Sequence, residues 1–364
     1  MNYFITENKD GRIRILNSPE YNYLFDTKTG YFARWGKTKE DDPTHSPFGP
    51  EIMDIEISTI CNQGCAWCYK SNTGQGSYMS FDDFKIMFDK FPKTLTQIAF
   101  GIGDINANPD MWKIFEYCRQ NKVVPNVTIN GTGLTDENAQ MLVKLCGAVA
   151  VSNYNTDTCY NAVEKLSKLG LEQVNIHMLL SDETYDRCMA ALDDASPIIG
   201  GTTKSGSLVR NDRRLDKIGA IVFLWLKPKG DRNVFHQVSN KEKYVRLVNT
   251  AISKGVPFGF DSCSAPFFLD AVQGHEKYDR YERLAESCES TLFSYYINVE
   301  GIGFPCSFTE GVKGWVGVDV LKADSFMKDV WLNKETIKFR EANIGSCDKN
   351  NCRHCQIYEL EYGK

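Results

Sequence analysis

Three cysteines lie close together in the first quarter of the chain. Cys61, Cys65 and Cys68 form the pattern CxxxCxxC within EISTICNQGCAWCYKSN, residues 56–72. Clustered thiolates bind zinc or iron–sulfur clusters. A structural zinc site needs a fourth ligand, and no further cysteine or histidine lies nearby in the sequence. Three thiolates suit a [4Fe–4S] cluster, in which one iron then stays open for a substrate or cofactor.

The composition predicts a soluble, globular, cytoplasmic protein. The 364 residues are 42% hydrophobic and 24% charged, enough for one large core and a smaller second unit. The N-terminal residues contain no apolar core behind basic residues, and no apolar stretch approaches the roughly 18 residues of a membrane span, so neither secretion nor membrane spanning is expected. Thirteen cysteines cannot form a disulfide framework in a reducing compartment, so metal binding is favoured for the clustered ones. A net charge of −5 argues against general nucleic-acid binding.

The elements that must position the cysteines follow an alternating pattern. From residue 51, short apolar runs alternate about six times with amphipathic stretches, which predicts an α/β fold with a parallel sheet. A helix is expected after Ser80, where Asp83 completes a capping box, and another should end before Gly170. We expect strands at Glu51–Ile57, Thr96–Ile102, Pro125–Asn130, Gly147–Ser152, Glu172–Leu180 and Gly219–Leu226.

Three segments are predicted: residues 1–50, 51–262 and 263–364. The first should carry a β-hairpin at Tyr23–Gly36, and the second should end with a helix at Lys241–Lys254 and a short strand at Pro257–Asp261. The polar stretch Gly200–Arg214 is expected to be a mobile loop, either a surface insertion or a lid over a substrate. Four isolated cysteines are expected to be buried thiols, namely Cys118, Cys146, Cys159 and Cys188.

The cysteine loop after the first strand resembles that of the radical S-adenosylmethionine (SAM) superfamily. Members carry CxxxCxφC, with φ aromatic, in a partial (β/α)6 barrel, and Trp67 is that aromatic residue here. The resemblance implies that the open iron binds the amino and carboxylate groups of SAM. One electron from an external reductant, such as flavodoxin or ferredoxin, then cleaves SAM to a 5′-deoxyadenosyl radical, which abstracts a hydrogen atom from the substrate.

Other positions resemble the SAM contacts of the superfamily. The stretch FGIGDINANPD, residues 100–110, lies where members carry a GGEP-like motif. Gly101 and Gly103 would let the backbone approach the SAM amino group, and Asp104 offers it a carboxylate. Asn130 and Ser152 end the third and fourth strands and resemble ribose and carboxylate contacts. The alternative is that these polar residues only cap the loops that follow.

The C-terminal cysteines resemble the SPASM and Twitch domains of radical SAM enzymes, which hold auxiliary [4Fe–4S] clusters. Cys288 and Cys306 flank Gly301 in a spacing that predicts a β-hairpin with a cysteine at each end. The segment CDKNNCRHC then adds Cys347, Cys352 and Cys355. The resemblance implies one auxiliary cluster, held by Cys288, Cys306, Cys352 and Cys355, with Cys347 able to replace one of them. A zinc ribbon is the alternative.

Cys263 lies between the predicted barrel and the C-terminal cysteines. It could be a cluster ligand, a buried thiol or a hydrogen-atom donor. A donor thiol can quench a carbon radical because its S–H bond is weaker than a C–H bond, and donation from the opposite face inverts a stereocentre. Peptide epimerases of the superfamily use a cysteine in this part of the chain, so Cys263 is the candidate catalytic residue.

The resemblance favours an enzyme that modifies a ribosomal peptide or protein. Epimerisation, crosslinking and side-chain oxidation are the expected reactions. The N-terminal segment is too short for a complete winged-helix domain that would bind a leader peptide. One alternative is dehydrogenation of a small alcohol by the same radical chemistry, and a non-enzymatic alternative is a zinc-binding nucleic-acid module.

Overall fold

The structure is a computed structural model that describes residues 2–38, 40–41, 43–197, 212–348 and 352–363. Of the loop expected at Gly200–Arg214, all but the last three residues lie outside these ranges. Within them, no helix has both the length and the apolar character that crossing a bilayer requires.

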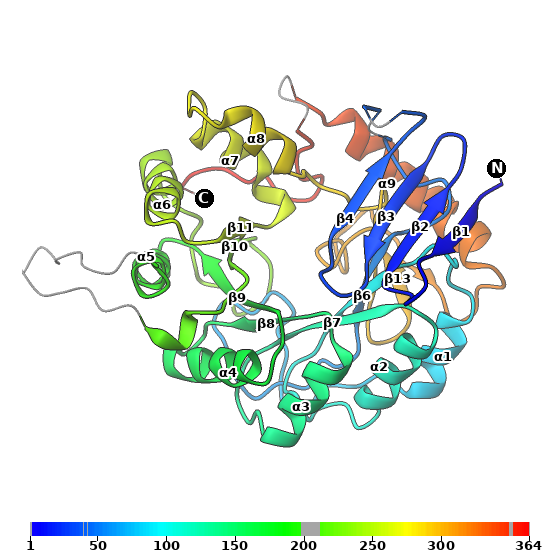
Figure 1. Ribbon diagram of the computed structural model, residues 1–364, viewed down its shortest axis with the longest axis horizontal. Coiled ribbons are helices and arrows are strands. Elements are labelled where there is room, and N and C mark those ends of the chain that lie inside the picture. Colours follow the sequence, from blue (N-terminus) through cyan, green and yellow to red (C-terminus); the bar gives the residue numbers. More distant parts are fainter. Residues whose placement is uncertain (1, 39, 42, 198–211, 349–351, 364) are drawn as a thin grey trace, which may run out of the picture.

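Parallel strands alternate with helices from residue 52 to residue 260, as the sequence predicts. The helices cover the outer face of the curved sheet (Figure 1). Each predicted strand is confirmed to within two residues at either end. The strands are β5 (Ile52–Glu56), β6 (Gln97–Gly101), β7 (Val124–Ile129), β8 (Ala148–Ser152), β9 (Gln173–Leu180), β10 (Ile221–Trp225) and β11 (Phe258–Phe260). The helices are α1 (Phe81–Phe88), α2 (Met111–Gln120), α3 (Asp136–Leu145), α4 (Thr156–Lys168), α5 (Tyr185–Asp194) and α6 (Lys241–Lys254).

Side chains at the helix ends explain where several helices begin and stop. The hydroxyl of Ser80 accepts a hydrogen bond from the backbone N–H of Asp83, which confirms the predicted cap of α1. Gly170 follows α4 with a φ of +97°, a left-handed conformation that suits glycine. Helix α2 begins at Met111 without a side-chain cap, and the carboxylate of Asp110 before it accepts from the N–H of Phe81 in the first turn of α1.

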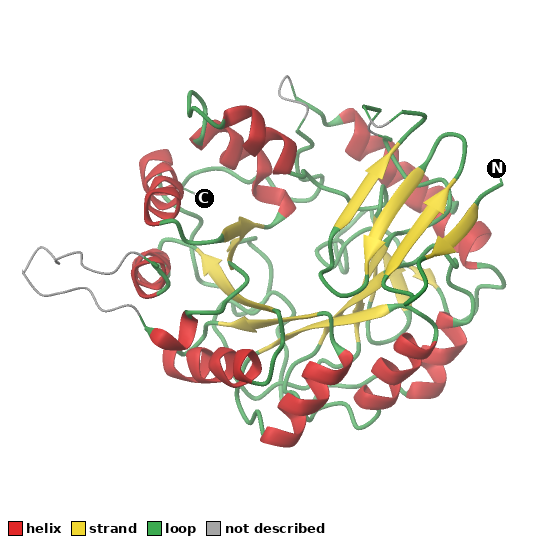
Figure 2. Cartoon of the chain, in the orientation of Figure 1, coloured by secondary structure: helices red, strands yellow, loops and turns green. Residues whose placement is uncertain are grey.

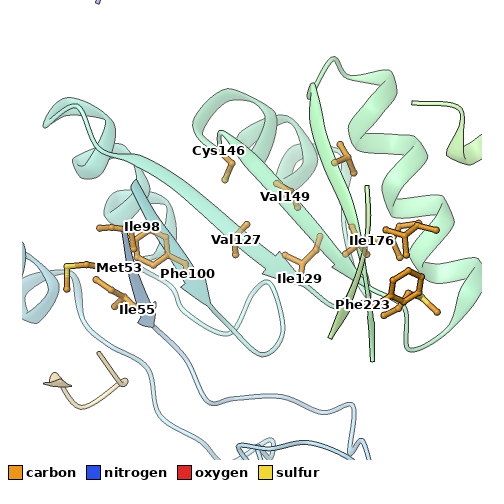
Figure 3. Packing of buried hydrophobic residues seen from close by; sticks show 14 of the residues in the cluster. Met53, Ile55, Ile98, Phe100, Val127, Ile129, Cys146, Val149, Ile176 and Phe223 are labelled. Carbon is orange, nitrogen blue, oxygen red and sulfur yellow. The ribbon is translucent and has the colours of Figure 1, made fainter. Parts of the chain in front are cut away.

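The main hydrophobic core lies between the sheet and the helices. Alternate residues of each strand point outward, so neighbouring strands contribute side chains to one layer, including Met53, Ile98, Val127 and Ile176 (Figure 3). Each of these is at most 3% exposed. The four isolated cysteines are buried too, as predicted. The other residues of each strand therefore face the lumen of the barrel.

The C-terminal hairpin extends the barrel sheet. Strand β12 (Ser294–Ile297) pairs in parallel with β5, and β13 (Ile302–Phe304) and β14 (Val318–Asp319) continue the sheet beyond it. Gly301 turns the β12–β13 hairpin with a φ of +76°, so the predicted hairpin is confirmed. The strand order is β11-β10-β9-β8-β7-β6-β5-β12-β13-β14. The division of the chain at residue 262 stays a prediction.

The N-terminal residues form a separate antiparallel sheet beside the barrel (Figure 2). Its strands are β1 (Phe4–Glu7), β2 (Ile13–Asn17), β3 (Asn22–Asp26) and β4 (Phe32–Trp35). The β3–β4 pair is the predicted hairpin, whereas β1 and β2 were not expected. The guanidinium of Arg14 donates to the carbonyl of Leu95 at 2.9 Å, and the hydroxyl of Tyr23 donates to the carbonyl of Thr94 at 2.8 Å. These bonds join the sheet to the loop before β6.

Short helices fill the C-terminal region, which the sequence analysis expected only to be rich in cysteine. A buried Arg340 lies with its guanidinium carbon 4.5 Å from the ring centre of Trp331 and donates to the carbonyl of Thr291 at 2.7 Å. These contacts fix the last helix against the hairpin. These elements are η2 (Ser262–Ser264), α7 (Ala265–Ala271), α8 (Tyr278–Leu284), the π-helical η3 (Phe326–Trp331) and α9 (Lys334–Gly345), and one more short helix, η1 (Arg213–Leu215), precedes β10 of the barrel.

Candidate active site

A cavity of about 460 Å³ opens at the carboxyl ends of the parallel strands. Small or polar residues occupy inward positions around it, among them Ala99, Gly101, Thr128 and Ser152. Barrel interiors are usually filled by bulky branched side chains, so these residues leave the lumen open. Ligands bind at this end of parallel α/β folds, which makes the cavity the candidate active site.

The loop after β5 brings the three predicted cysteines to the cavity. Cys61, Cys65 and Cys68 all line it. The backbone N–H of Cys61 bonds to the carbonyl of Thr73 at 2.9 Å, and the N–H of Cys68 bonds to the carbonyl of Cys65 at 3.2 Å. The loop is therefore folded back on itself with its thiols on one side.

Two glycines hold this loop at close range. A Cβ atom on Gly103 would lie 1.9 Å from the carbonyl oxygen of Ile60 and 2.7 Å from the Cβ of Cys61. A Cβ atom on Gly230 would lie 2.2 Å from the carbonyl oxygen of Cys68. The exits of β6 and β10 thus clamp the loop from two sides, and only glycine leaves room for the contact.

Asp104 fastens the loop to two neighbouring strands. One carboxylate oxygen accepts from the backbone N–H of Asn62 at 3.1 Å and from its side-chain amide at 3.0 Å. The other accepts from the side-chain amide of Asn130 at 2.9 Å. Asp104 is not among the residues that line the cavity. Its predicted contact with the SAM amino group stays a prediction.

The other predicted contact residues lie around the cavity. Trp67, Gly101, Gly103, Asn130 and Ser152 all line it. The ring centre of Trp67 lies 4.8 Å from that of Phe235 and 5.8 Å from that of Tyr154. The loop after β5 is therefore packed on aromatic side chains from the exits of β8 and β10.

Two titratable side chains of the lumen were not predicted as functional residues. Asp54 is exposed to the cavity yet enclosed by the barrel, and burial raises its pKa to about 6. Among the described residues, the carboxylate of Asp54 has no hydrogen-bond or ion-pair partner, and only its backbone is paired, in the sheet. His177 also lines the cavity, and burial lowers its pKa to about 4, so the imidazole is neutral near pH 7. Strand alternation could have placed Asp54 in the lumen, because Met53 and Ile55 point outward.

A buried ion-pair network lies beside the cavity. The ammonium of Lys70, two residues after the last loop cysteine, lies 3.1 Å from the carboxylate of Glu56 and pairs also with Glu310. It donates to the hydroxyl of Tyr296 at 2.9 Å. Burial raises the pKa of Glu56, and the charge of Lys70 opposes that rise. The network joins the cysteine loop, the first barrel strand and the C-terminal region.

Arg232 is a further cavity residue that the sequence analysis missed. Its guanidinium donates to the carbonyl of Asn72 at 2.7 Å, and its Nε has no partner among the described residues. Burial raises the pKa of Cys61 and Cys65, and the charge of Arg232 opposes that rise. Arg232 thus supplies a cation next to the cysteine loop.

The predicted C-terminal cysteines fall into two groups. Burial raises the pKa of Cys288 and Cys306, and electrostatic interactions with Cys355 add to the rise, so these three lie near one another. Cys352 instead interacts with Cys347. The joint role of these cysteines as ligands of one cluster stays a prediction.

Cys263 lies with the first of these groups. It lies within η2, just after β11, and its thiol interacts with that of Cys355. It also interacts electrostatically with Cys288. Cys263 is not among the residues that line the cavity.

The donor sets fit iron–sulfur clusters better than single metal ions. In the described ranges, no three histidine, cysteine, aspartate or glutamate side chains converge as ligands of one ion. A tetrahedral zinc site requires such convergence. In a [4Fe–4S] cluster each thiolate binds a different iron, so the sulfurs stand farther apart. Three cysteines around an open lumen match that second arrangement.

Replacing Gly103 should disrupt the metal-binding loop. In a Gly103→Ala variant the new Cβ collides with the backbone of Ile60, so the loop must move. We expect the anaerobically reconstituted variant to lose most of the iron bound by Cys61, Cys65 and Cys68, measured as iron per chain. Gly101→Ala is the matched control, because its Cβ would meet only ordinary contacts at 3.6 Å or more. Equal iron contents in the two variants would contradict the clamp.

Replacing Lys70 should destabilise the fold in a pH-dependent way. Lys70→Met leaves Glu56 buried without its cation, which we expect to cost about 3 kcal/mol of unfolding free energy near neutral pH. Because the pKa of Glu56 then lies further above its unfolded value, the deficit should shrink as the pH falls toward about 5 and Glu56 is protonated.

Denaturant unfolding at several pH values measures this effect. Adding Glu56→Gln to Lys70→Met should recover part of the loss. Lys85→Met, which removes an exposed pair with Asp89, should cost less than about 1 kcal/mol. A Lys70 variant no less stable than the Lys85 variant would show that the network is dispensable.

One protein-family model matches part of the barrel. Residues 55–195 match the family model described as the Radical SAM superfamily. No curated protein matches the chain.

Solved structures share its fold. SuiB of Streptococcus suis bound to the precursor peptide SuiA is similar with a TM-score of 0.69 and 12% identity, over 98% of this chain and 96% of that one. SuiB bound to S-adenosylmethionine is similar with a TM-score of 0.64 and 14% identity, over 85% of this chain and 74% of that one. Native anSMEcpe with bound AdoMet and the Cp18Cys peptide is similar with a TM-score of 0.54 and 15% identity, over 85% of this chain and 93% of that one. With the cysteine loop on the rim of a parallel barrel, this chain carries a radical SAM domain over residues 55–195, which implies SAM and a [4Fe–4S] cluster as cofactors.

Proposed function

We propose that the enzyme modifies a residue of a ribosomal peptide or protein by hydrogen-atom abstraction. The observation that carries the proposal is the likeness to SuiB with its precursor peptide, which spans 98% of this chain and so includes the C-terminal region as well as the barrel. The anSMEcpe structure also holds a peptide. The cavity is bounded on one side by Ser307 and Phe308 of the C-terminal region, so a substrate would enter between the two parts.

The cysteine loop and its surroundings would hold the cofactors. Cys61, Cys65 and Cys68 would bind three irons of the cluster, which together with SAM supplies a 5′-deoxyadenosyl radical. Trp67, within the loop, packs on Phe235 and Tyr154, and Arg232 would offer a cation to the carboxylate of SAM. The backbone at Gly101 and Gly103 and the side chains of Asn130 and Ser152 would contact the rest of SAM.

Deeper in the lumen, Asp54 is the acceptor available to a substrate. The cavity's lysines are already paired, Lys70 with Glu56 and Glu310, and Lys227 with Asp261. An enclosed carboxylate without a partner favours a substrate group that donates hydrogen bonds to it. The neutral imidazole of His177 can donate or accept one hydrogen bond without adding charge.

The C-terminal cysteines would hold one auxiliary [4Fe–4S] cluster. Cys288, Cys306 and Cys355 lie together in this region, which supports a shared site. Lys229 fixes the nearby loop to the barrel, because its ammonium donates to the carbonyls of Ser307 at 3.0 Å and Glu310 at 2.8 Å. Such a cluster would accept the electron that the substrate radical gives up when it loses a proton and is oxidised.

The position of Cys263 bears on the type of reaction. Epimerisation with Cys263 as hydrogen donor would need this thiol to reach the substrate, and Cys263 does not line the cavity. Crosslinking or side-chain oxidation needs no donor thiol, so these reactions are favoured. The reductant would be an external one-electron carrier such as flavodoxin or ferredoxin, and the reducing cytoplasm suits both clusters.

Mass spectrometry after anaerobic turnover tests the proposal. Reconstituted enzyme is incubated with SAM, dithionite and candidate precursor peptides in deuterated water, with Cys65→Ala as the control that lacks the first cluster. We expect 5′-deoxyadenosine and a peptide lighter by two hydrogens, which indicates crosslinking or oxidation. Deuterium gain without net loss would indicate epimerisation instead. If no peptide changes, while small alcohols incubated in the same way are oxidised, the peptide proposal fails.

A further inference from the structure

We propose that Cys263, and not Cys352, completes the auxiliary cluster with Cys288, Cys306 and Cys355. The inference rests on the proposed auxiliary cluster and names its ligands. It changes the ligand set that the sequence favours, and it removes Cys263 from the chemistry of the lumen.

The four thiols come from four separate segments that the fold brings together. Cys263 follows β11, Cys288 precedes β12, Cys306 follows β13, and Cys355 lies near the C-terminus. The ammonium of Lys227 pairs with Asp261, two residues before Cys263, and lies 5.4 Å from the ring centre of Phe308, two residues after Cys306. That ring centre lies 6.2 Å from that of Tyr358, whose N–H donates to the sulfur of Cys355. The guanidinium of Arg353 reaches Cys288 from the same C-terminal segment. These contacts bring the four segments together, and the electrostatic interactions among the thiols agree with them.

Backbone contacts hold these cysteines in place. The side-chain amide of Asn343 donates to the carbonyl of Cys288 at 3.2 Å and lies 3.7 Å from its sulfur. The guanidinium of Arg353 donates to the same carbonyl at 2.6 Å. The backbone N–H of Tyr358 lies 3.4 Å from the sulfur of Cys355. N–H groups aimed at sulfur stabilise a thiolate and are typical of cluster ligands.

Cys352 lies outside this set. Its backbone N–H donates to the carboxylate of Asp348 at 3.0 Å, and its thiol interacts with Asp348 and Cys347. The side chain is 2% exposed and packs in the main hydrophobic core. Since no helical turn joins it to Cys355, the two cysteines of this CxxC need not share a face. Cys352 is a buried core thiol in this arrangement.

The charges around the set suit a bound anion. Four thiolates around a [4Fe–4S] core give a net negative site, which needs nearby cations when it is buried. The ammonium of Lys227 is buried, pairs with Asp261, and interacts with both Cys263 and Cys355. A sulfur bound to iron in this way carries no hydrogen to donate, so Cys263 is a ligand and not the donor of an epimerase.

Iron analysis in a simplified background tests the assignment. Replacing Cys61, Cys65 and Cys68 together with alanine removes the first cluster and leaves the auxiliary one. We expect about four irons per chain after anaerobic reconstitution of this triple variant. Adding Cys263→Ser should lower the iron content or change the electron paramagnetic resonance spectrum of the reduced protein. Adding Cys352→Ser should leave both unchanged. Thermal unfolding of each variant checks that it is folded.

The outcomes separate the ligand assignment from the auxiliary cluster itself. A triple variant that binds no iron overturns both the auxiliary cluster and this assignment. A triple variant with four irons that keeps its iron and spectrum with Cys263→Ser, and loses them with Cys352→Ser, overturns the assignment alone. If Cys263→Ser does not fold, Cys263→Ala in the triple variant and alkylation of the reconstituted triple variant test whether Cys263 is a ligand. Protection of Cys263 from alkylation that is lost on removing iron supports ligation, and protection independent of iron contradicts it.

Discussion

The site depends on the close approach of two strand exits to the cysteine loop. Gly103 meets the loop at Ile60 and Cys61, and Gly230 meets it at Cys68, at distances that exclude any side chain. The N–H of Asp104 bonds to the carbonyl of Ile60 at 3.0 Å, so the clamp is also hydrogen-bonded. A loop of irregular backbone would otherwise sample many conformations, and fixing it in one arrangement costs conformational entropy that these contacts offset. Three thiols can then face one lumen together.

The open lumen exists because successive side chains along each strand point alternately outward and inward. Outward residues are apolar and pack on helices, whereas inward residues are small or polar at the carboxyl end. The outward face of the sheet thus packs in the main hydrophobic core, and the inward face is free to bind ligands. The Lys70 network then ties the rim to the C-terminal region, so that a change in one part affects the other.

Local patterns in the sequence predicted the barrel strands, the cysteine loop with Trp67 in it, and the β12–β13 hairpin. Contacts between distant segments were not predictable in this way. Lys70 pairs with Glu310, which is 240 residues away, and Arg353 donates to the carbonyl of Cys288, which lies 65 residues earlier. The CxxC spacing favours Cys352 as a ligand because spacing reports only which cysteines are neighbours in the chain, whereas the proposed set with Cys263 joins segments that are distant in the chain. Strand alternation could have identified Asp54 as a lumen residue. Arg232 lies in an irregular loop, where no periodicity predicts the direction of a side chain.

Labelled SAM tests most directly whether the three-cysteine loop leaves an iron open for the cofactor. The measurement is pulsed electron paramagnetic resonance of the reduced Cys288→Ser/Cys306→Ser variant, in which the first cluster gives the signal, with ¹⁵N in the amino group and ¹⁷O in the carboxylate of SAM. The account predicts hyperfine coupling from both labels. A signal that SAM leaves unchanged, with no coupling to either label, would contradict it.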